Sequence, residues 1–166
     1  MARPRNNGNA KWVNALNLSE LHRLLGQVYQ LPEAERKEAR ARLQAAYTRQ
    51  MQTHLAQFTG SARFFRMGAP FQQFVHTEGV QFLAQQAGCY WLLDLIASYR
   101  PRYRGETLLV ARLTAQDSVG RFTLSVDERI LARQKIAFTD FPMSEIELWV
   151  ARNEEGGYTI LLPSEH

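Results

Sequence analysis

The hydrophobic pattern of the chain changes its period near Gly105, and this change constrains the fold more than any other feature. Before Gly105, apolar residues recur every three to four positions, as they do along one side of an α-helix. After Gly105, apolar and polar residues alternate, as in residues 122–126 (FTLSV), which is typical of a strand with one buried face. The sequence therefore predicts an α+β fold, with helices first and an antiparallel sheet after them.

Three helices are expected before Gly105. Asn17 and Glu20 resemble a capping box and open a first helix, which ends near residue 29. A second helix over 32–58 has only a thin apolar seam and needs a partner, so the two should form a helical hairpin. The third helix, over 78–99, is apolar nearly all round, which is typical of a central core helix.

The part after Gly105 contains about five strand-like runs separated by turn signals. Short links favour antiparallel neighbours, so a meander is the simplest topology, and the helix over 78–99 is the natural cover for its apolar face. The polar, basic residues 1–16 read as a disordered arm, which leaves a hairpin extension at 17–58 and an α+β domain at 59–166. The expected strands are 107–115, 121–127, 130–138, 145–152 and 158–162.

Several classes of function are disfavoured by missing sequence features. Cys89 is the only cysteine in the 166 residues, so no intrachain disulfide and no cysteine-based metal site is expected. The four histidines show no metal-binding spacing, and the chain has no GxSxG, P-loop or GxGxxG motif. No apolar run is long enough for a bilayer span, and the first residues lack a secretory apolar segment. We expect a cytoplasmic protein without metal or cofactor.

The net charge of +4 is unevenly distributed. Residues 1–70 carry 11 Lys/Arg and 4 acidic residues, whereas residues 71–166 carry 9 and 12. Of the 20 cations 17 are arginine, whose planar guanidinium binds carboxylates and phosphates in a bidentate manner. A basic segment attracts an acidic protein surface or nucleic acid, although a solvated helix face is the simpler reading. The predicted binding residues are Arg36, Lys37, Arg40, Arg42, Arg63, Arg66, Arg100, Arg102, Tyr103 and Arg104.

Asp94 lies in the middle of the apolar run CYWLLDLIAS, residues 89–98. A carboxylate buried there needs a hydrogen-bond or ionic partner, since burying a bare charge costs several kcal/mol. We expect Asp94 to be a structural polar residue inside the covered helix. The candidate partners are the hydroxyls of Tyr90 and Tyr99, an arginine of the sheet such as Arg112 or Arg133, or a backbone N–H.

Asp140, in the sequence TDFP, suggests an Asx-type turn and is also interpreted as structural. The alternative for both aspartates is acid–base chemistry together with His76. That hypothesis requires the side chains of Asp94, Asp140 and His76 to converge on one solvent-reachable pocket.

From about Gln57 onward, four stretches of the sequence carry a family resemblance: QFTGSARFFR, HTEGVQFLAQQAGCYWLLDLIAS, AFTDFPMSEIELWVA and LLPSE. Their order and spacing resemble a family of small uncharacterised prokaryotic proteins that are often found on mobile elements. The resemblance implies a shared compact fold over residues 57–166 and implies no activity. Family members usually have an acidic residue after FTG(S/T), where this chain has Ala62.

These features favour a non-enzymatic binding protein that engages an acidic protein or ribonucleoprotein surface with its arginines. An anti-defence inhibitor is one form of this hypothesis, by association with mobile elements. Direct DNA or RNA binding is the first alternative, and a hydrolase built on Asp94, Asp140 and His76 is the second. A homodimer is also considered, because the thin seam of the helix over 32–58 is incompletely covered.

Overall fold

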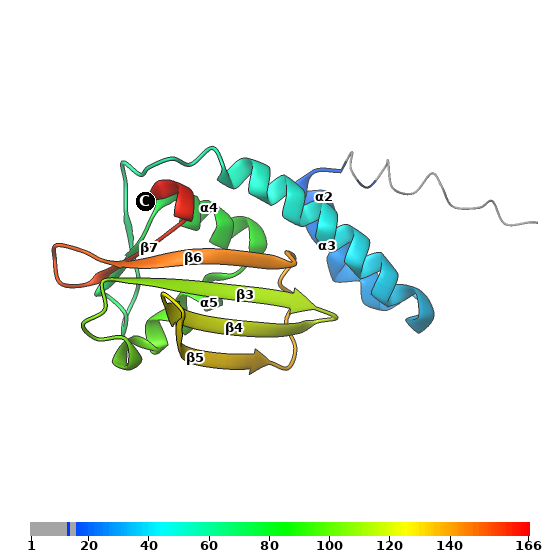
Figure 1. The fold of residues 1–166 in the computed structure, drawn as a ribbon. Helices are drawn as coiled ribbons and strands as arrows, with labels where there is room; N and C mark the ends of the chain where they lie inside the picture. The colour runs from blue at the N-terminus through cyan, green and yellow to red at the C-terminus, as the bar shows by residue number, and fades with distance from the viewer. Residues whose placement is uncertain (1–12, 14–15) are drawn as a thin grey trace, which may run out of the picture.

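A computed structural model describes residue 13 and residues 16–166, so the predicted arm at 1–16 lies almost entirely outside the described residues. The fold class is confirmed as α+β, with four α-helices preceding five long or medium strands in this part of the chain (Figure 1). The helices are α2 (Leu18–Gln27), α3 (Glu33–Leu55), α4 (Glu78–Ala87) and α5 (Tyr90–Ser98), and single 3-10 turns follow α2, α5 and the last strand.

The sheet has seven strands, so the predicted number of five is too small. Two short strands, β1 (Phe65–Arg66) and β2 (Phe74–His76), precede α4. The longer strands are β3 (Leu108–Gln116), β4 (Val119–Val126), β5 (Arg129–Ile136), β6 (Glu145–Arg152) and β7 (Tyr158–Leu161).

The strand order is β1-β2-β7-β6-β3-β4-β5, which departs from a simple meander. Strands β3, β4 and β5 follow one another as predicted, but β6 crosses back and pairs with the other side of β3. The pairing of β2 with β7 is parallel, and the other pairings in the sheet are antiparallel. β5 is therefore an edge strand eight residues long, whereas β1, at the opposite edge, has only two.

One face of the sheet is covered by α4 and α5, which lie behind the strands in Figure 1. The strand residues on this face are buried, among them Leu113, Phe122 and Leu148, and the ring of Tyr99 stacks on Phe122. The predicted single helix over 78–99 is wrong in detail, since Gly88 adopts a left-handed conformation with φ of 63° and ends α4. Glycine has no Cβ penalty in this conformation, so the break is encoded locally.

The helical hairpin forms as predicted, and α2 begins with the expected capping box. The amide of Glu20 donates to Asn17 Oδ1 and the amide of Asn17 donates to Glu20 Oε2, both at 2.9 Å. The second half of α3 belongs to the main core, where Tyr47 and Met51 are fully buried. Its first half, up to residue 42, is exposed or half-buried. Among the described helices, none is long and apolar enough to cross a membrane.

Candidate binding surface

The cations of α3 do not form one open basic patch, because three of them have partners within the described chain. Arg36 Nε donates to the carbonyl of Leu31 at 2.8 Å. Lys37 Nζ lies 3.6 Å from a carboxylate oxygen of Asp117, and Arg42 pairs with Glu38 one helical turn away at 2.7 Å. Arg40 differs from these three, since its side chain lines a cavity.

The two predicted arginines that precede α4 also form ion pairs within the chain. Arg63 forms an ion pair with Glu78 at 3.2 Å, and Arg66 pairs with Glu155 at 3.3 Å while donating to the carbonyl of Gln72. A partner that binds these two arginines would therefore have to replace their ion pairs within the chain.

The segment from 100 to 104 contains one clear correction. Tyr103, predicted to be a residue of the binding surface, is fully buried and its hydroxyl donates to the carbonyl of Ile96 at 2.9 Å. Burial raises the pKa of this hydroxyl above its ordinary value. Arg100 is half-buried with an unsatisfied buried Nε, whereas Arg102 and Arg104 are exposed. The aromatic residue of this loop thus stabilises the core and is not available for a partner.

Three cations without an ionic partner lie on the open face of the sheet, on β4 and β5. Arg121 and Lys135 are directly opposite each other in the strand register, and Arg133 is opposite Thr123 on the same face. All three cations are exposed, and none has a hydrogen bond or ion pair with any described residue. We call Arg121, Arg133 and Lys135 the basic strand face. Like charges directly opposite each other in a sheet are destabilising.

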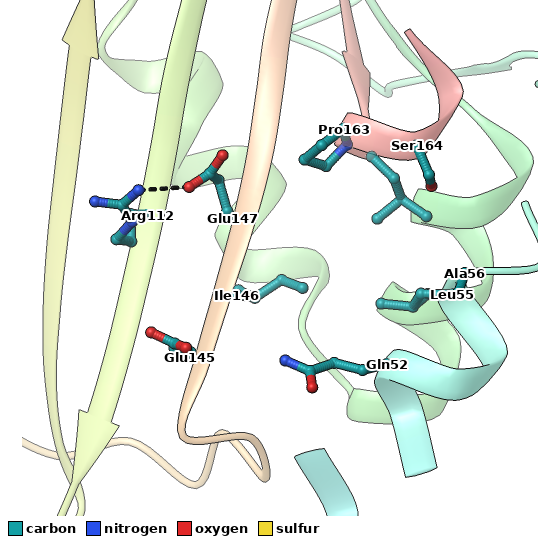
Figure 2. A pocket seen from close by; sticks show the side chains of 10 residues that line it. Gln52, Leu55, Ala56, Arg112, Glu145, Ile146, Glu147, Pro163 and Ser164 are labelled. Atoms are coloured by element: carbon teal, nitrogen blue, oxygen red, sulfur yellow. Dashed lines mark hydrogen bonds and ion pairs between the residues drawn. The ribbon is translucent and has the colours of Figure 1, made fainter. Parts of the chain in front are cut away.

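The neighbouring part of the same face, on β6, is acidic and partly neutralised. Arg112 on β3 forms an ion pair with Glu147 at 2.5 Å, and this hydrogen bond is the main reason why the pKa of Glu147 lies below its usual range. Glu145 is exposed two residues earlier. Figure 2 shows this ion pair beside a cavity of about 490 Å³ that also borders Gln52 and Pro163. The open face is therefore divided into an acidic part and a basic part.

A groove connects the basic strand face to α3. Its volume is about 560 Å³, and it lies between α3 and the ends of β3, β4 and β5. Arg121 and Lys135 line it from the sheet, and Ala41 and Ala45 line it from α3. Asp117, the ionic partner of Lys37, also lines it from the β3–β4 turn. We call it the α3–sheet groove. Small side chains on the helix leave the two cations accessible from this side.

The aspartate of the apolar helix is not the buried polar residue that we expected. Asp94 is exposed on α5, and its carboxylate has no hydrogen bond or ion pair with any described residue. Two of the proposed partners are engaged elsewhere, since the hydroxyl of Tyr99 donates to Gln134 at 2.7 Å and Arg112 pairs with Glu147. The nine-residue helix buries its opposite side, so Asp94 simply faces solvent.

The turn at TDFP is also organised differently from the prediction. Asp140 is exposed, and the side chain that caps the turn is Thr139, whose Oγ1 accepts from the amide of Phe141 at 3.2 Å. The turn is thus a threonine turn, not an Asx turn.

The third member of the hypothetical hydrolase site, His76, is buried on β2. Its Nε2 lies 2.6 Å from Gln81 Oε1 and its ring stacks on Phe65, while Nδ1 is buried without a partner among the described residues. Desolvation lowers the pKa of His76 below its ordinary value. Neither a hydrogen bond nor an ion pair joins any two of His76, Asp94 and Asp140 in the described structure.

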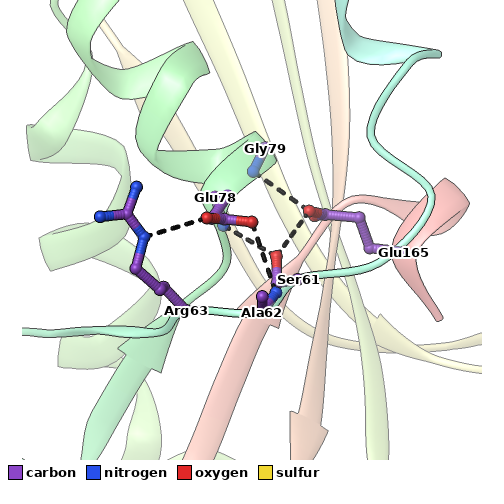
Figure 3. Close-up of polar contacts among 6 residues, drawn as sticks. All are labelled: Ser61, Ala62, Arg63, Glu78, Gly79 and Glu165. Carbon is purple, nitrogen blue, oxygen red and sulfur yellow. Dashed lines mark hydrogen bonds and ion pairs between the residues drawn. The ribbon is translucent and has the colours of Figure 1, made fainter.

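A second polar group of residues brings three of the family-like stretches together around Glu165 (Figure 3). Its Oε1 accepts from Ser61 Oγ at 3.0 Å and from the amide of Gly79 at 3.1 Å. Its Oε2 accepts from Thr77 Oγ1 at 2.5 Å and from the amide of Leu162 at 3.0 Å. We call these five residues the Glu165 cluster. The carboxylate satisfies a free amide at the start of α4, which is a structural function.

Glu78, next to this cluster, has partners of its own. Its amide donates to Ser61 Oγ at 2.9 Å, and its carboxylate accepts from Ala62 N and from Arg63. The position after FTGS, where this chain has Ala62, thus borders a carboxylate, as Figure 3 shows.

Two further observations concern chemistry at these sites. Within residues 13 and 16–166, no three His, Cys, Asp or Glu side chains are grouped so that they could hold a metal ion. Cys89 is buried, and desolvation raises the pKa of its thiol to about 12, so the thiol is not a nucleophile at neutral pH.

Comparison with known proteins gives one match. No curated protein and no solved structure matches the chain. The model of a family of unknown function, DUF6876, matches residues 49–166, which begin within α3 and include the whole sheet. The chain therefore belongs to the DUF6876 family of unknown function.

Proposed function

We propose that this protein is a non-enzymatic binding protein, and that an acidic surface of a partner protein docks on the basic strand face and the α3–sheet groove. The observation that carries the proposal is the direct opposition of Arg121 and Lys135 beside Arg133, none of which forms an ion pair with a described carboxylate. Such an arrangement costs folding free energy in the isolated chain. A partner carboxylate between the cations removes that cost, so charge complementarity selects an acidic partner.

The carboxylates and the aromatic residue near the basic strand face favour an acidic protein over nucleic acid as the partner. Nucleic-acid surfaces combine a continuous basic track with aromatic side chains on which bases stack. Here Glu145 and Glu147 interrupt the basic area on the β6 side. Trp149, an aromatic residue of this face, lies on the acidic strand and donates to Glu147 at 3.0 Å. A phosphate backbone would meet like charge over half of this face.

The biological setting that fits this proposal is inhibition inside the cell. A cytoplasmic protein from a mobile element that covers a surface of a host protein would act as an anti-defence inhibitor. This part of the proposal rests on the resemblance to mobile-element proteins. Small proteins of that kind often act by covering the surface of another macromolecule.

The test measures binding of a fluorescein-labelled decapeptide of glutamate by anisotropy at low salt. Replacing Arg121, Arg133 and Lys135 by alanine should weaken binding about tenfold, since each surface ion pair contributes up to about 1 kcal/mol. The matched control replaces Arg102, Arg104 and Arg152, which are also exposed, and should change the affinity less than twofold.

The control makes the outcomes distinct, because both triple variants have the same net charge. Equal weakening in the two variants would show non-specific attraction and would contradict the proposal. Tighter binding of single-stranded DNA or RNA of similar charge, with the same dependence on the three cations, would assign the surface to nucleic acid instead.

A further inference from the structure

A second cavity lies on the other side of Gln44 and Ala115 from the α3–sheet groove, since both residues line both cavities. Its volume is about 310 Å³, and it is formed by α2, α3, the β3–β4 turn and the loop before β6. Two of the six exposed large hydrophobic residues in the described chain line it, namely Tyr29 at 64% and Phe138 at 76% exposure. We call it the Arg40 cavity.

Two charged side chains of the Arg40 cavity have no ionic partner among the described residues. Arg40 is half-buried and forms neither a hydrogen bond nor an ion pair with any described residue. Asp140, which also lines the cavity, is likewise without a described partner. A cation and an anion beside exposed aromatic rings can recognise a ligand that is itself both aromatic and polar.

Gln44 adds a fixed hydrogen-bond acceptor. The side chain is only 9% exposed, and its Nε2 donates to the carbonyls of Ala115 at 3.1 Å and Met143 at 2.8 Å. Both hydrogens of the amide are therefore used, and the direction of Oε1 is held. Oε1 has no partner among the described residues and remains available to an N–H group in the cavities that Gln44 lines.

We infer that the Arg40 cavity receives a tryptophan or tyrosine side chain of the acidic partner. This inference rests on the proposed function and gives the partner a sequence character: an aromatic residue flanked by acidic ones. The ring packs against Phe138 and Tyr29, and its indole N–H or hydroxyl donates to Asp140. A flanking carboxylate binds Arg40, and the further acidic residues cross Gln44 into the α3–sheet groove, where Arg121 and Lys135 lie.

The size and composition of the cavity support an aromatic anchor. A volume of about 310 Å³ is at the lower end of the range for small-ligand pockets, which suits one large side chain. Buried aromatic anchors contribute most of the affinity in many interfaces, and aromatic pairs add to the burial of area. A mononucleotide also combines a ring with an anion, and it is the alternative occupant that the experiment tests.

The experiment uses two labelled peptides, fluorescein-Gly-Glu-Glu-Trp-Glu-Glu and the same peptide with alanine in place of tryptophan. The tryptophan peptide should bind about tenfold more tightly to the unmodified protein. Phe138→Ala and Arg40→Ala should remove that advantage. Phe64→Ala, which truncates another exposed aromatic residue at 57% exposure, should retain it. Because Phe138 is exposed, the variant should keep the Tm of the unmodified protein, which is measured alongside.

Each outcome separates this inference from the proposed function. If both peptides bind equally, and both are weakened by alanine at Arg121, Arg133 and Lys135, the Arg40 cavity is not an anchor site but the acidic docking surface stands. If neither peptide binds, both proposals are wrong. If adenosine monophosphate displaces the tryptophan peptide and Phe138→Ala abolishes nucleotide binding, the cavity is a nucleotide site and the inference is overturned.

Discussion

The Glu165 cluster and the basic strand face are two groups of polar residues with opposite charge balance. In the first, one carboxylate accepts from two hydroxyls and two backbone amides. In the second, Arg121 and Lys135 face each other without a carboxylate between them. Satisfied polar groups stabilise a fold, whereas unsatisfied charge lowers its stability and attracts a partner. The contrast predicts that mutations in the two groups separate stability from binding.

The largest effect is expected from Glu165→Ala. Removing the carboxylate leaves the amides of Gly79 and Leu162 and two hydroxyls without their acceptor, which should lower the free energy of unfolding by about 3 kcal/mol. Urea denaturation measures this change. Glu154→Ala, in the exposed β6–β7 turn, is the control and should stay within about 0.5 kcal/mol. Equal effects of the two substitutions would show that the cluster is not a stabilising element.

A smaller loss is expected from Gly79→Ala in the same cluster. A Cβ at this position would lie 2.5 Å from Leu162 Cδ1 and 2.9 Å from Glu165 Oε1, so the side chains of Leu162 and Glu165 have to move, and the carboxylate of Glu165 is held by its hydrogen bonds. Overpacking of this kind costs about 2 kcal/mol. Gly68→Ala, where no atom lies within 4 Å of the added Cβ, should leave the midpoint of urea unfolding unchanged.

The basic strand face should respond in the opposite direction. Lys135→Glu places a carboxylate opposite Arg121 and should raise the free energy of unfolding by about 0.5 kcal/mol. The same substitution should weaken binding of the glutamate decapeptide by up to about tenfold. Arg104→Glu makes the same charge change at an exposed site outside the sheet and should alter neither quantity. A loss of stability in Lys135→Glu would contradict the view that this cation is uncompensated.

His76 directly precedes Thr77 of the Glu165 cluster, and it should make the stability of the fold depend on pH. Burial lowers the pKa of His76 in the folded chain below its unfolded value near 6.5. The folded state therefore favours the neutral ring, so this contribution to stability is present above pH 6.5 and is lost as the pH falls through the folded pKa. His76→Gln should reduce the decline of stability between pH 7.5 and 5.0. An unchanged decline would assign the pH dependence to other groups.

The fold class was predictable because the period of hydrophobicity changes at Gly105. The alternation is clear in β3, β4 and β6, since each of these strands has one buried face. In the edge strand β5 only Ala132 is buried. β1 and β2 have two and three residues, which is too short for any period to show. The break between α4 and α5 was missed because apolar residues continue through Gly88, and only its left-handed conformation separates the two helices.

The binding surface was less predictable, because it depends on strand register. Arg121 and Lys135 lie 14 positions apart, and only the pairing of β4 with β5 makes them direct neighbours. A charge count along the chain assigns both to a region of net negative charge. Asp94 and Tyr103 show the same limit in another form. The apolar neighbours of Asp94 suggested that it is buried, but it lies on the exposed side of α5. The basic neighbours of Tyr103 suggested that it is accessible, but its side chain is buried and its hydroxyl donates to the carbonyl of Ile96.

The most direct test of the central claim is a titration of the ¹⁵N-labelled protein with the glutamate decapeptide, followed by amide chemical shifts. The account predicts that the largest shift changes map to β4, β5 and the side of α3 that contains Ala41 and Ala45. Changes confined to the region of Arg36 and Arg42, or to Arg102 and Arg104, would place the acidic partner on the helices or the loop and would contradict the account.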